Sequence, residues 1–233
     1  AFIRPEIGYC QGMNFIAGAL INSMDNEEKC FWIFLAFIDN FDMNFLYLKN
    51  MPDYSIRVYQ LNFYIKEYFP ELAMHFKKNQ INPDVFFSKW ILTIFSNYLP
   101  FEVLYKVWDV FVLEKWKAIF KFSLMILNSM KDKLINMDLV TFSQFIKDNK
   151  NNSSLINFEE FSQHYKDYKI TNRQLNELRE DFFIDQLRTK LEDNETEWET
   201  DQKDYVNNYK KELEEHLTNF RTLIQQLEEE INK

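Results

Sequence analysis

The sequence predicts an all-α fold, and its composition gives three reasons for expecting one. Three glycines and five prolines in 233 residues supply few of the turn residues that multi-stranded folds require. Apolar residues make up 46% of the chain, enough to form a sizeable core. The 24 phenylalanines, with apolar residues that recur at intervals of three and four, favour long helices packed through aromatic side chains. We therefore expect a multi-helix globular domain.

The N-terminal part of the chain predicts two helices. Residues 13–24 place apolar side chains at helical intervals, so Gln11 should lie at or just before a helix start. Either Asp25 or Asn26 can cap the next helix, whose first turn carries two glutamates. Its body, residues 31–38, is apolar on nearly every side, and we expect it to be a central core helix.

Two more helices follow, and prolines mark their boundaries. Ser55 begins a helix that ends at Pro70, because proline cannot continue it. Asn82 can cap the next one with Pro83 at its first position, and its apolar stripe continues to Phe95.

The second half of the chain is also helical in pattern. Pro100 begins a helix, residues 116–130 form its antiparallel neighbour, and 138–146 and 172–191 have helical spacing. The polar segment 148–154 between them predicts a surface loop. The buried stripe expected after Pro100 consists of Val103, Leu104, Val107, Trp108 and Phe111.

The negative charge of the chain is concentrated at its C-terminal end. The formal net charge is −9, of which residues 191–233 contribute −8 and residues 1–190 contribute −1. This change in composition predicts a domain over 1–190 followed by an acidic helical extension over 191–233. Since the chain carries no basic stripe for phosphate backbones, we exclude nucleic acid as a partner.

The extension contains the seam of a coiled coil over residues 213–231. Such a helix would either self-associate or bind a partner helix, or fold back along the domain, and the pattern does not choose between them. The seam residues, spaced alternately by four and three, are Leu213, Leu217, Phe220, Ile224, Leu227 and Ile231.

Cysteine and histidine usage predicts neither a metal site nor a cofactor of the protein's own. Cys10 and Cys30 are too few for a zinc site and are expected to be reduced thiols in a cytoplasmic protein. The longest apolar run, residues 31–38, falls well short of the roughly 18 residues needed to span a bilayer.

The most informative segment is Gly8-Tyr9-Cys10-Gln11-Gly12, because the three glycines of the chain all lie within residues 8–18. Gly8 and Gly12 let the backbone turn freely, or approach a partner closely, on either side of Tyr9 and Gln11. This arrangement would present the side chain of Gln11 to a partner.

This segment resembles the glutamine-finger motif (Tyr-x-Gln) of the TBC domain, a GTPase-activating module for Rab-type small GTPases. Residues 83–120, with the Leu99-Pro100 break and the Val107-Trp108-Asp109 segment, are similar to the later part of the same domain, and the resemblance covers roughly residues 1–190. It implies that Gln11 is catalytic and that Gly8, Tyr9 and Gly12 support its loop.

The resemblance also implies what comes from other molecules. A Rab-family GTPase would be the partner and would carry the GTP and Mg²⁺, and since Rab proteins are lipid-anchored, the chain would reach membranes only indirectly, as a peripheral protein. The family's catalytic arginine lies in an Ile-x-x-Asp-x-x-Arg motif upstream of the glutamine motif. Nothing before Gly8 matches that motif, and Arg4 does not take its place.

A glutamine suits this chemistry because GTP hydrolysis needs a water molecule in line with the γ-phosphate. A neutral amide accepts a hydrogen bond from that water and donates one to a phosphate oxygen without adding charge, whereas a glutamate would repel the phosphate. Two hypotheses follow. The chain is either part of a Rab GTPase activator that regulates vesicle trafficking, or a catalytically inactive TBC-like scaffold that binds GTPases or other partners through its domain and its tail.

Overall fold

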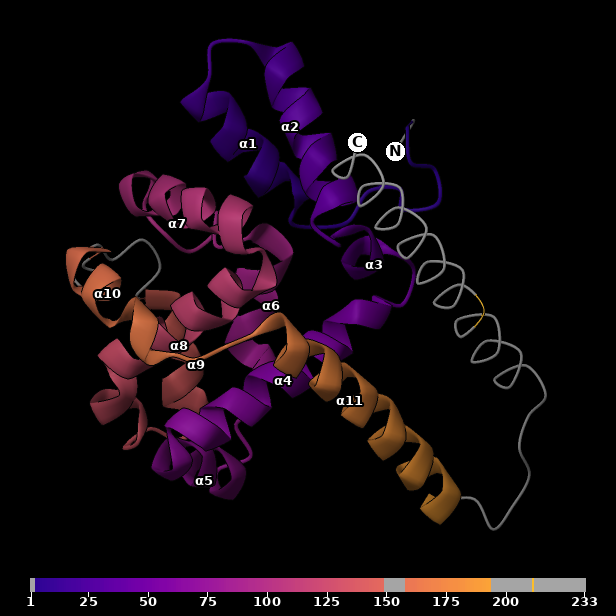
Figure 1. The fold of residues 1–233 in the computed structure, drawn as a ribbon. Helices are drawn as coiled ribbons and strands as arrows, with labels where there is room; N and C mark the ends of the chain where they lie inside the picture. The colour runs from indigo at the N-terminus through magenta and orange to yellow at the C-terminus, as the bar shows by residue number, and fades with distance from the viewer. Residues whose placement is uncertain (1–2, 149–157, 194–210, 212–233) are drawn as a thin grey trace, which may run out of the picture. The chain divides into compact units, whose positions relative to one another are not determined.

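The computed structural model describes residues 3–148, 158–193 and 211, and all regular secondary structure in these residues is helical (Figure 1). The prediction of an all-α fold is confirmed. The helices are α1 (Met13–Ser23), α2 (Glu27–Asn40), α3 (Asn44–Tyr47), α4 (Pro52–Tyr68), α5 (Pro70–Lys78), α6 (Asp84–Thr93), α7 (Phe101–Glu114), α8 (Trp116–Leu134), α9 (Leu139–Asp148), α10 (Phe158–His164), the 3₁₀ helix η2 (Tyr165–Asp167) and α11 (Asn172–Asp193).

The chain divides into two units, residues 1–182 and 183–233. The boundary that we expected near residue 190 stays a prediction. The polar loop at 148–154 lies, apart from its first residue, outside the described residues, and so does the whole seam 213–231. The coiled-coil character of the extension therefore also stays a prediction.

The core of the first unit is built around α6 and α8. Helix α6 contacts α1, α4, α8 and α9, and α8 contacts α4, α6, α7 and α10. Side chains are buried on almost every side of α8, including fully buried Ile119, Phe120 and Leu124. Three aromatic side chains of α6, Phe86, Phe87 and Trp90, are also fully buried.

The expectation that residues 31–38 form a central core helix is wrong. In α2 only Cys30, Phe37 and Ile38 are buried, while Phe31 is 43% and Trp32 is 56% exposed. Figure 1 shows α1 and α2 side by side at one end of this unit, where α2 has fewer neighbours than α8. A short apolar run in a helix can lie at the surface, because its burial depends on which other helices pack against it.

Several helix boundaries follow the expected caps. The side chain of Asn26 accepts a hydrogen bond from the N–H of Lys29 at 2.9 Å and so caps α2. The buried side chains of α7 are those of the predicted stripe. Helix α4 begins at Pro52, earlier than the expected Ser55, because proline is favoured in a first turn. Helix α4 ends at Tyr68, just before Pro70, as expected, and Pro70 also begins α5.

Helix α6 ends earlier than its apolar pattern predicts. It stops at Thr93, and Ile94 and Phe95 adopt left-handed backbone conformations with φ of 45° and 63°. Both side chains remain fully buried, so the apolar pattern predicted their burial correctly and their helical conformation wrongly. The indole N–H of Trp108 donates to the Ile94 carbonyl at 2.8 Å and stabilises this turn. We call residues 92–95 the α6 end turn.

In the described part of the chain, no helix combines the length and apolar character that crossing a bilayer requires.

Candidate functional site: the glutamine loop

The glutamine loop, residues 4–12, is tied to α2 at its start. The guanidinium of Arg4 donates to Asp39 of α2, from Nε to Oδ1 at 3.0 Å and from Nη2 to Oδ2 at 2.5 Å. The N–H groups of Ile7 and Gly8 both donate to the Arg4 carbonyl, at 3.2 and 3.1 Å. The start of the loop is therefore anchored to α2, and a hydrogen-bonded turn follows it.

A second turn closes the loop against α1. The N–H of Met13 donates to the Cys10 carbonyl at 3.2 Å, and the N–H of Phe15 donates to the Gly12 carbonyl at 3.1 Å. The backbone of Cys10 donates in return to the Met13 sulfur at 3.4 Å. Gln11 lies inside this turn, directly before α1, as the sequence predicted.

The two glycines that flank Gln11 are required for different reasons. Gly8 has a φ of 66°, but a Cβ atom there would meet no heavy atom within 4 Å. Gly12 has a φ of 118°, and a Cβ atom there would lie 3.1 Å from the Leu92 carbonyl oxygen and 3.3 Å from Cγ2 of Thr93. Gly12 is thus needed both for its backbone conformation and for the close approach of the loop to the α6 end turn.

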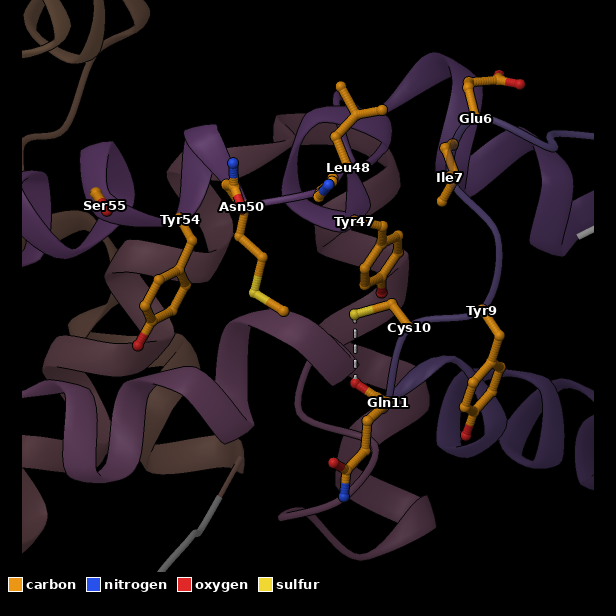
Figure 2. A pocket seen from close by; sticks show the side chains of 12 residues that line it. Glu6, Ile7, Tyr9, Cys10, Gln11, Tyr47, Leu48, Asn50, Tyr54 and Ser55 are labelled. Atoms are coloured by element: carbon orange, nitrogen blue, oxygen red, sulfur yellow. Dashed lines mark hydrogen bonds between the residues drawn. The ribbon is translucent and has the colours of Figure 1, made fainter.

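The side chain of Gln11 is exposed, and Figure 2 shows its amide extending from the loop away from Tyr47 and Cys10. Its neighbour Cys10 is 8% exposed, and the thiol donates to the Gln11 carbonyl at 3.7 Å. Burial raises the pKa of the Cys10 thiol, which keeps it protonated. The loop therefore buries one side chain and exposes the amide beside it.

Tyr9 also lies at the surface, with 69% of its area exposed. Its hydroxyl donates a long hydrogen bond of 3.4 Å to Oδ1 of Asn14 in α1. This contact joins the loop to the first turn of α1.

A cleft of about 540 Å³ opens beside the loop. Its opposite wall is the segment between α3 and α4, where Asn50 and Met51 have left-handed conformations with φ of 69° and 47°. At its far side the hydroxyl of Tyr54 donates to Oδ1 of Asp84 at 2.7 Å. The cleft is lined by Glu6, Ile7, Tyr9, Cys10, Gln11, Tyr47, Leu48, Lys49, Asn50, Met51, Tyr54 and Ser55 (Figure 2).

Tyr47 contacts the α6 end turn next to the glutamine loop, and nothing in the sequence pattern singled it out. Its side chain is buried, and its hydroxyl donates to the Leu92 carbonyl at 2.7 Å. Burial, with a smaller contribution from Cys10, raises the pKa of Tyr47, so the phenol remains a hydrogen-bond donor. No motif joins Tyr47 to the glutamine loop, and only the fold brings them together.

The arginines of the described residues are all engaged within the chain. Each of these five guanidinium groups forms an ion pair with a carboxylate, so none is left unpaired near Gln11. No group of three or more histidine, cysteine or acidic side chains gathers in a metal-binding arrangement in the described part of the chain. The arginine pairs are Arg4–Asp39, Arg57–Asp53, Arg173–Glu177, Arg179–Asp53 and Arg188–Asp185.

Comparison with known proteins identifies the family. The model of the Rab-GTPase-TBC domain matches residues 1–135, which is more than half of the chain and includes the whole glutamine loop. The chain belongs to the Rab-GTPase-TBC domain family. The resemblance inferred from the glutamine motif is thereby confirmed.

Curated relatives of this TBC domain are much longer proteins. Human TBC1 domain family member 14 is 34% identical over 61% of the chain, and the human ecotropic viral integration site 5 protein homolog is 30% identical over 60%. The Rab GTPase-activating protein eat-17 of Caenorhabditis elegans is 31% identical over 58%. The matched regions are 20%, 17% and 15% of those proteins. The chain thus spans a fifth or less of their length.

Solved structures support the fold. The flagellar RabGAP TBC domain of Chlamydomonas superposes with a TM-score of 0.56 at 24% identity, covering 64% of this chain and 49% of that one. The Ypt/Rab-GAP domain of Gyp1p also gives a TM-score of 0.56, at 16% identity, covering 81% of this chain and 63% of that one. At these identities the likeness concerns the fold alone, and the roles of Gln11, Gly8, Tyr9 and Gly12 stay predictions.

Proposed function

We propose that this TBC domain accelerates GTP hydrolysis by a Rab-family small GTPase, with Gln11 as a finger inserted in trans, and that it regulates vesicle trafficking. The observation that carries the proposal is the exposure of the Gln11 amide on a loop whose backbone is fixed at both ends. Membership in the family supports the same function.

The loop suits a water-positioning role. A finger must reach into a partner's active site, and Gln11 extends from the protein with no partner for its amide among the described hydrogen bonds. It must also arrive in one orientation, because a catalytic group displaced by about 1 Å can lose roughly 100-fold in rate. In the partner, the amide accepts from the attacking water and donates to a γ-phosphate oxygen.

The arginine that neutralises charge on the phosphoryl group comes, in this proposal, from outside this chain. The ion pairs of the five described arginines support this, since Arg4, the arginine in the glutamine loop itself, is held by Asp39. An arginine finger is worth about 10³- to 10⁵-fold in rate, or roughly 4 to 7 kcal/mol. Residues 1–233 alone should therefore be a poor activator, while the GTP and Mg²⁺ reside on the GTPase.

The decisive experiment is single-turnover GTP hydrolysis by a panel of Rab proteins, with the full-length protein to which this domain belongs. The test variant is Gln11→Ala. The matched control is Gln163→Ala in α10, because Gln163 is likewise exposed on the first unit. We expect strong acceleration of at least one Rab protein, lost in Gln11→Ala and unchanged in Gln163→Ala.

Two outcomes would contradict the proposal. Equal acceleration of GTP hydrolysis by the wild type and Gln11→Ala would show that Gln11 is not a catalytic finger. A folded full-length protein that binds a Rab protein without accelerating hydrolysis would instead favour a scaffold that binds GTPases. In that case binding partners of residues 191–233 become the next question.

A further inference from the structure

We propose that Tyr47 is a positioning residue for the glutamine finger, acting through the Leu92 carbonyl and Gly12. The inference rests on the proposed function, because it states how the chain fixes the orientation of Gln11. Three contacts carry it, and they connect α3, the α6 end turn and the glutamine loop in series.

The first contact arises from the way α6 ends. The N–H groups that follow Leu92 donate elsewhere: Phe95 to the Trp90 carbonyl at 2.8 Å, and Ser96 to the Thr93 carbonyl at 3.0 Å. The Leu92 carbonyl therefore needs a donor from outside the helix. The Tyr47 hydroxyl supplies it at 2.7 Å.

The second contact joins this carbonyl to the loop. A Cβ atom on Gly12 would lie 3.1 Å from the Leu92 oxygen, so the Gly12 backbone packs directly on the group that Tyr47 fixes. Gly12 follows Gln11 in the chain. A shift of the Leu92 carbonyl therefore moves the surface on which the backbone next to the finger rests.

The third set of contacts makes the α6 end turn a firm support. The hydroxyl of Thr93 donates to the Lys89 carbonyl at 2.5 Å and accepts from the N–H of Asn97 at 3.3 Å. The Trp108 indole fixes the Ile94 carbonyl from α7. Tyr47 fixes the same turn from α3, at the wall of the cleft that faces Gln11.

Removing the Tyr47 hydroxyl should therefore loosen the finger without removing it. Tyr47→Phe keeps the buried ring and leaves the Leu92 carbonyl without its donor, and an acceptor that loses its partner costs free energy, which favours a shift of the α6 end turn. We expect the maximal rate of activated GTP hydrolysis to fall by roughly 10- to 100-fold, since reaction rates depend on the placement of catalytic groups to within about 1 Å. The affinity for the GTPase should stay within about twofold.

The experiment is a double-mutant cycle in the full-length protein, with Tyr47→Phe, Gln11→Ala and the double variant, measured at saturating activator. The control is Tyr64→Phe, because the buried hydroxyl of Tyr64 has no hydrogen-bond partner and lies in the core. If Tyr47 acts through Gln11, Tyr47→Phe lowers the rate of the wild type and has no further effect in Gln11→Ala. Tyr64→Phe should leave the rate unchanged.

A readout that needs no GTPase separates this inference from the proposed function. The Met13 N–H closes the turn around Gln11, so its hydrogen exchange should be faster in Tyr47→Phe than in the wild type or Tyr64→Phe. Unchanged exchange at Met13, or an equal fall in rate in the wild-type and Gln11→Ala backgrounds, overturns the role of Tyr47. A wild type that activates no GTPase overturns the proposed function, while the exchange result still decides whether Tyr47 orders the loop.

Discussion

Gln11 and Gln60 carry the same side chain in opposite surroundings. Gln60 is fully buried in α4, where its amide donates to the Leu175 carbonyl of α11 at 2.7 Å and accepts from Nη1 of Arg57 at 3.4 Å. Gln11 is exposed, and its amide extends from the loop. The amide of Gln60 forms its hydrogen bonds inside the protein, whereas the amide of Gln11 is available to a group on another molecule.

The surroundings of Gln60 form a buried ion cluster that joins α4 to α11. Asp53, 1% exposed, accepts from Arg57 at 2.8 and 2.9 Å and from Arg179 at 2.6 Å. The Arg57 guanidinium also lies 4.3 Å from the centre of the Trp116 ring. Burial lowers the pKa of Arg57, against the charge of Asp53. Every charged group in this cluster has its partner within the chain.

The comparison shows what separates a structural polar group from a candidate catalytic one. In the ion cluster both the side chains and their partners are internal, so a substitution should change stability. In the glutamine loop the backbone is fixed by internal contacts while the side chain is not, so a substitution at Gln11 should change activity alone.

The largest effect on stability is expected for Arg57→Ala. It leaves the buried Asp53 carboxylate with only one partner, and breaking a buried ion pair costs about 3 to 5 kcal/mol. Chemical denaturation measures the free energy of unfolding. Arg173→Ala is the control, because the Arg173–Glu177 pair is exposed and its loss should change stability by less than about 1 kcal/mol. Equal effects of the two substitutions would contradict the importance of burial.

The next largest effect is a difference in stability between alanine variants of the two glutamines. Gln60→Ala leaves the Leu175 carbonyl and a hydrogen of Arg57 without partners, and we expect a loss of about 2 to 3 kcal/mol in unfolding free energy. Gln11→Ala should change it by less than about 0.5 kcal/mol, as is usual for exposed positions. A clear destabilisation by Gln11→Ala would mean that its effect on GTP hydrolysis cannot be assigned to catalysis.

The three glycines should form a graded series of alanine variants. Gly12→Ala combines a φ of 118° with a contact to the Leu92 oxygen and should cost about 1 to 3 kcal/mol. Gly8→Ala has a φ of 66° in open space and should cost about 1 kcal/mol. Gly18→Ala lies within α1 with no close neighbour and should stabilise by up to about 1 kcal/mol. Thermal unfolding of the three variants checks the order, and a Gly12→Ala variant that is no less stable than Gly8→Ala would refute the packing of Gly12 on α6.

The smallest effect concerns Cys10. Because burial raises its pKa above the value of about 8.5 for a free thiol, its stabilising contribution is complete below that pH and is lost as the pH rises through the folded pKa. In a Cys30→Ala variant, a thiol reagent at pH 8 should modify Cys10 far more slowly than it modifies glutathione, and unfolding should remove the difference. Modification of Cys10 at the same rate as glutathione would show that its thiol is accessible to solvent in the folded protein.

Much of the fold was predictable from local pattern. The helix starts near Met13, Pro100 and Trp116 follow from spacing and proline, which act within a few residues. Capping chemistry limited the cap of α2 to Asp25 or Asn26, and the structure uses Asn26. Boundaries that depend on distant contacts were less predictable. Ile94 and Phe95 leave the helix in a turn where the Ile94 carbonyl accepts from the Trp108 indole, a contact between two segments of the chain.

The candidate site divides in the same way. The sequence by itself determined that Gln11 lies between two glycines just before a helix, since glycine is what permits the positive φ angles there. It also determined the all-α class through its apolar spacing. Only the tertiary structure decided that α8 is the central helix in place of α2, that the ion cluster engages Arg57 and Arg179, and that the Tyr47 hydroxyl meets the Leu92 carbonyl beside Gly12. These features depend on side chains that meet only after the chain has folded, whereas helix starts and glycine turns depend on neighbours along the chain.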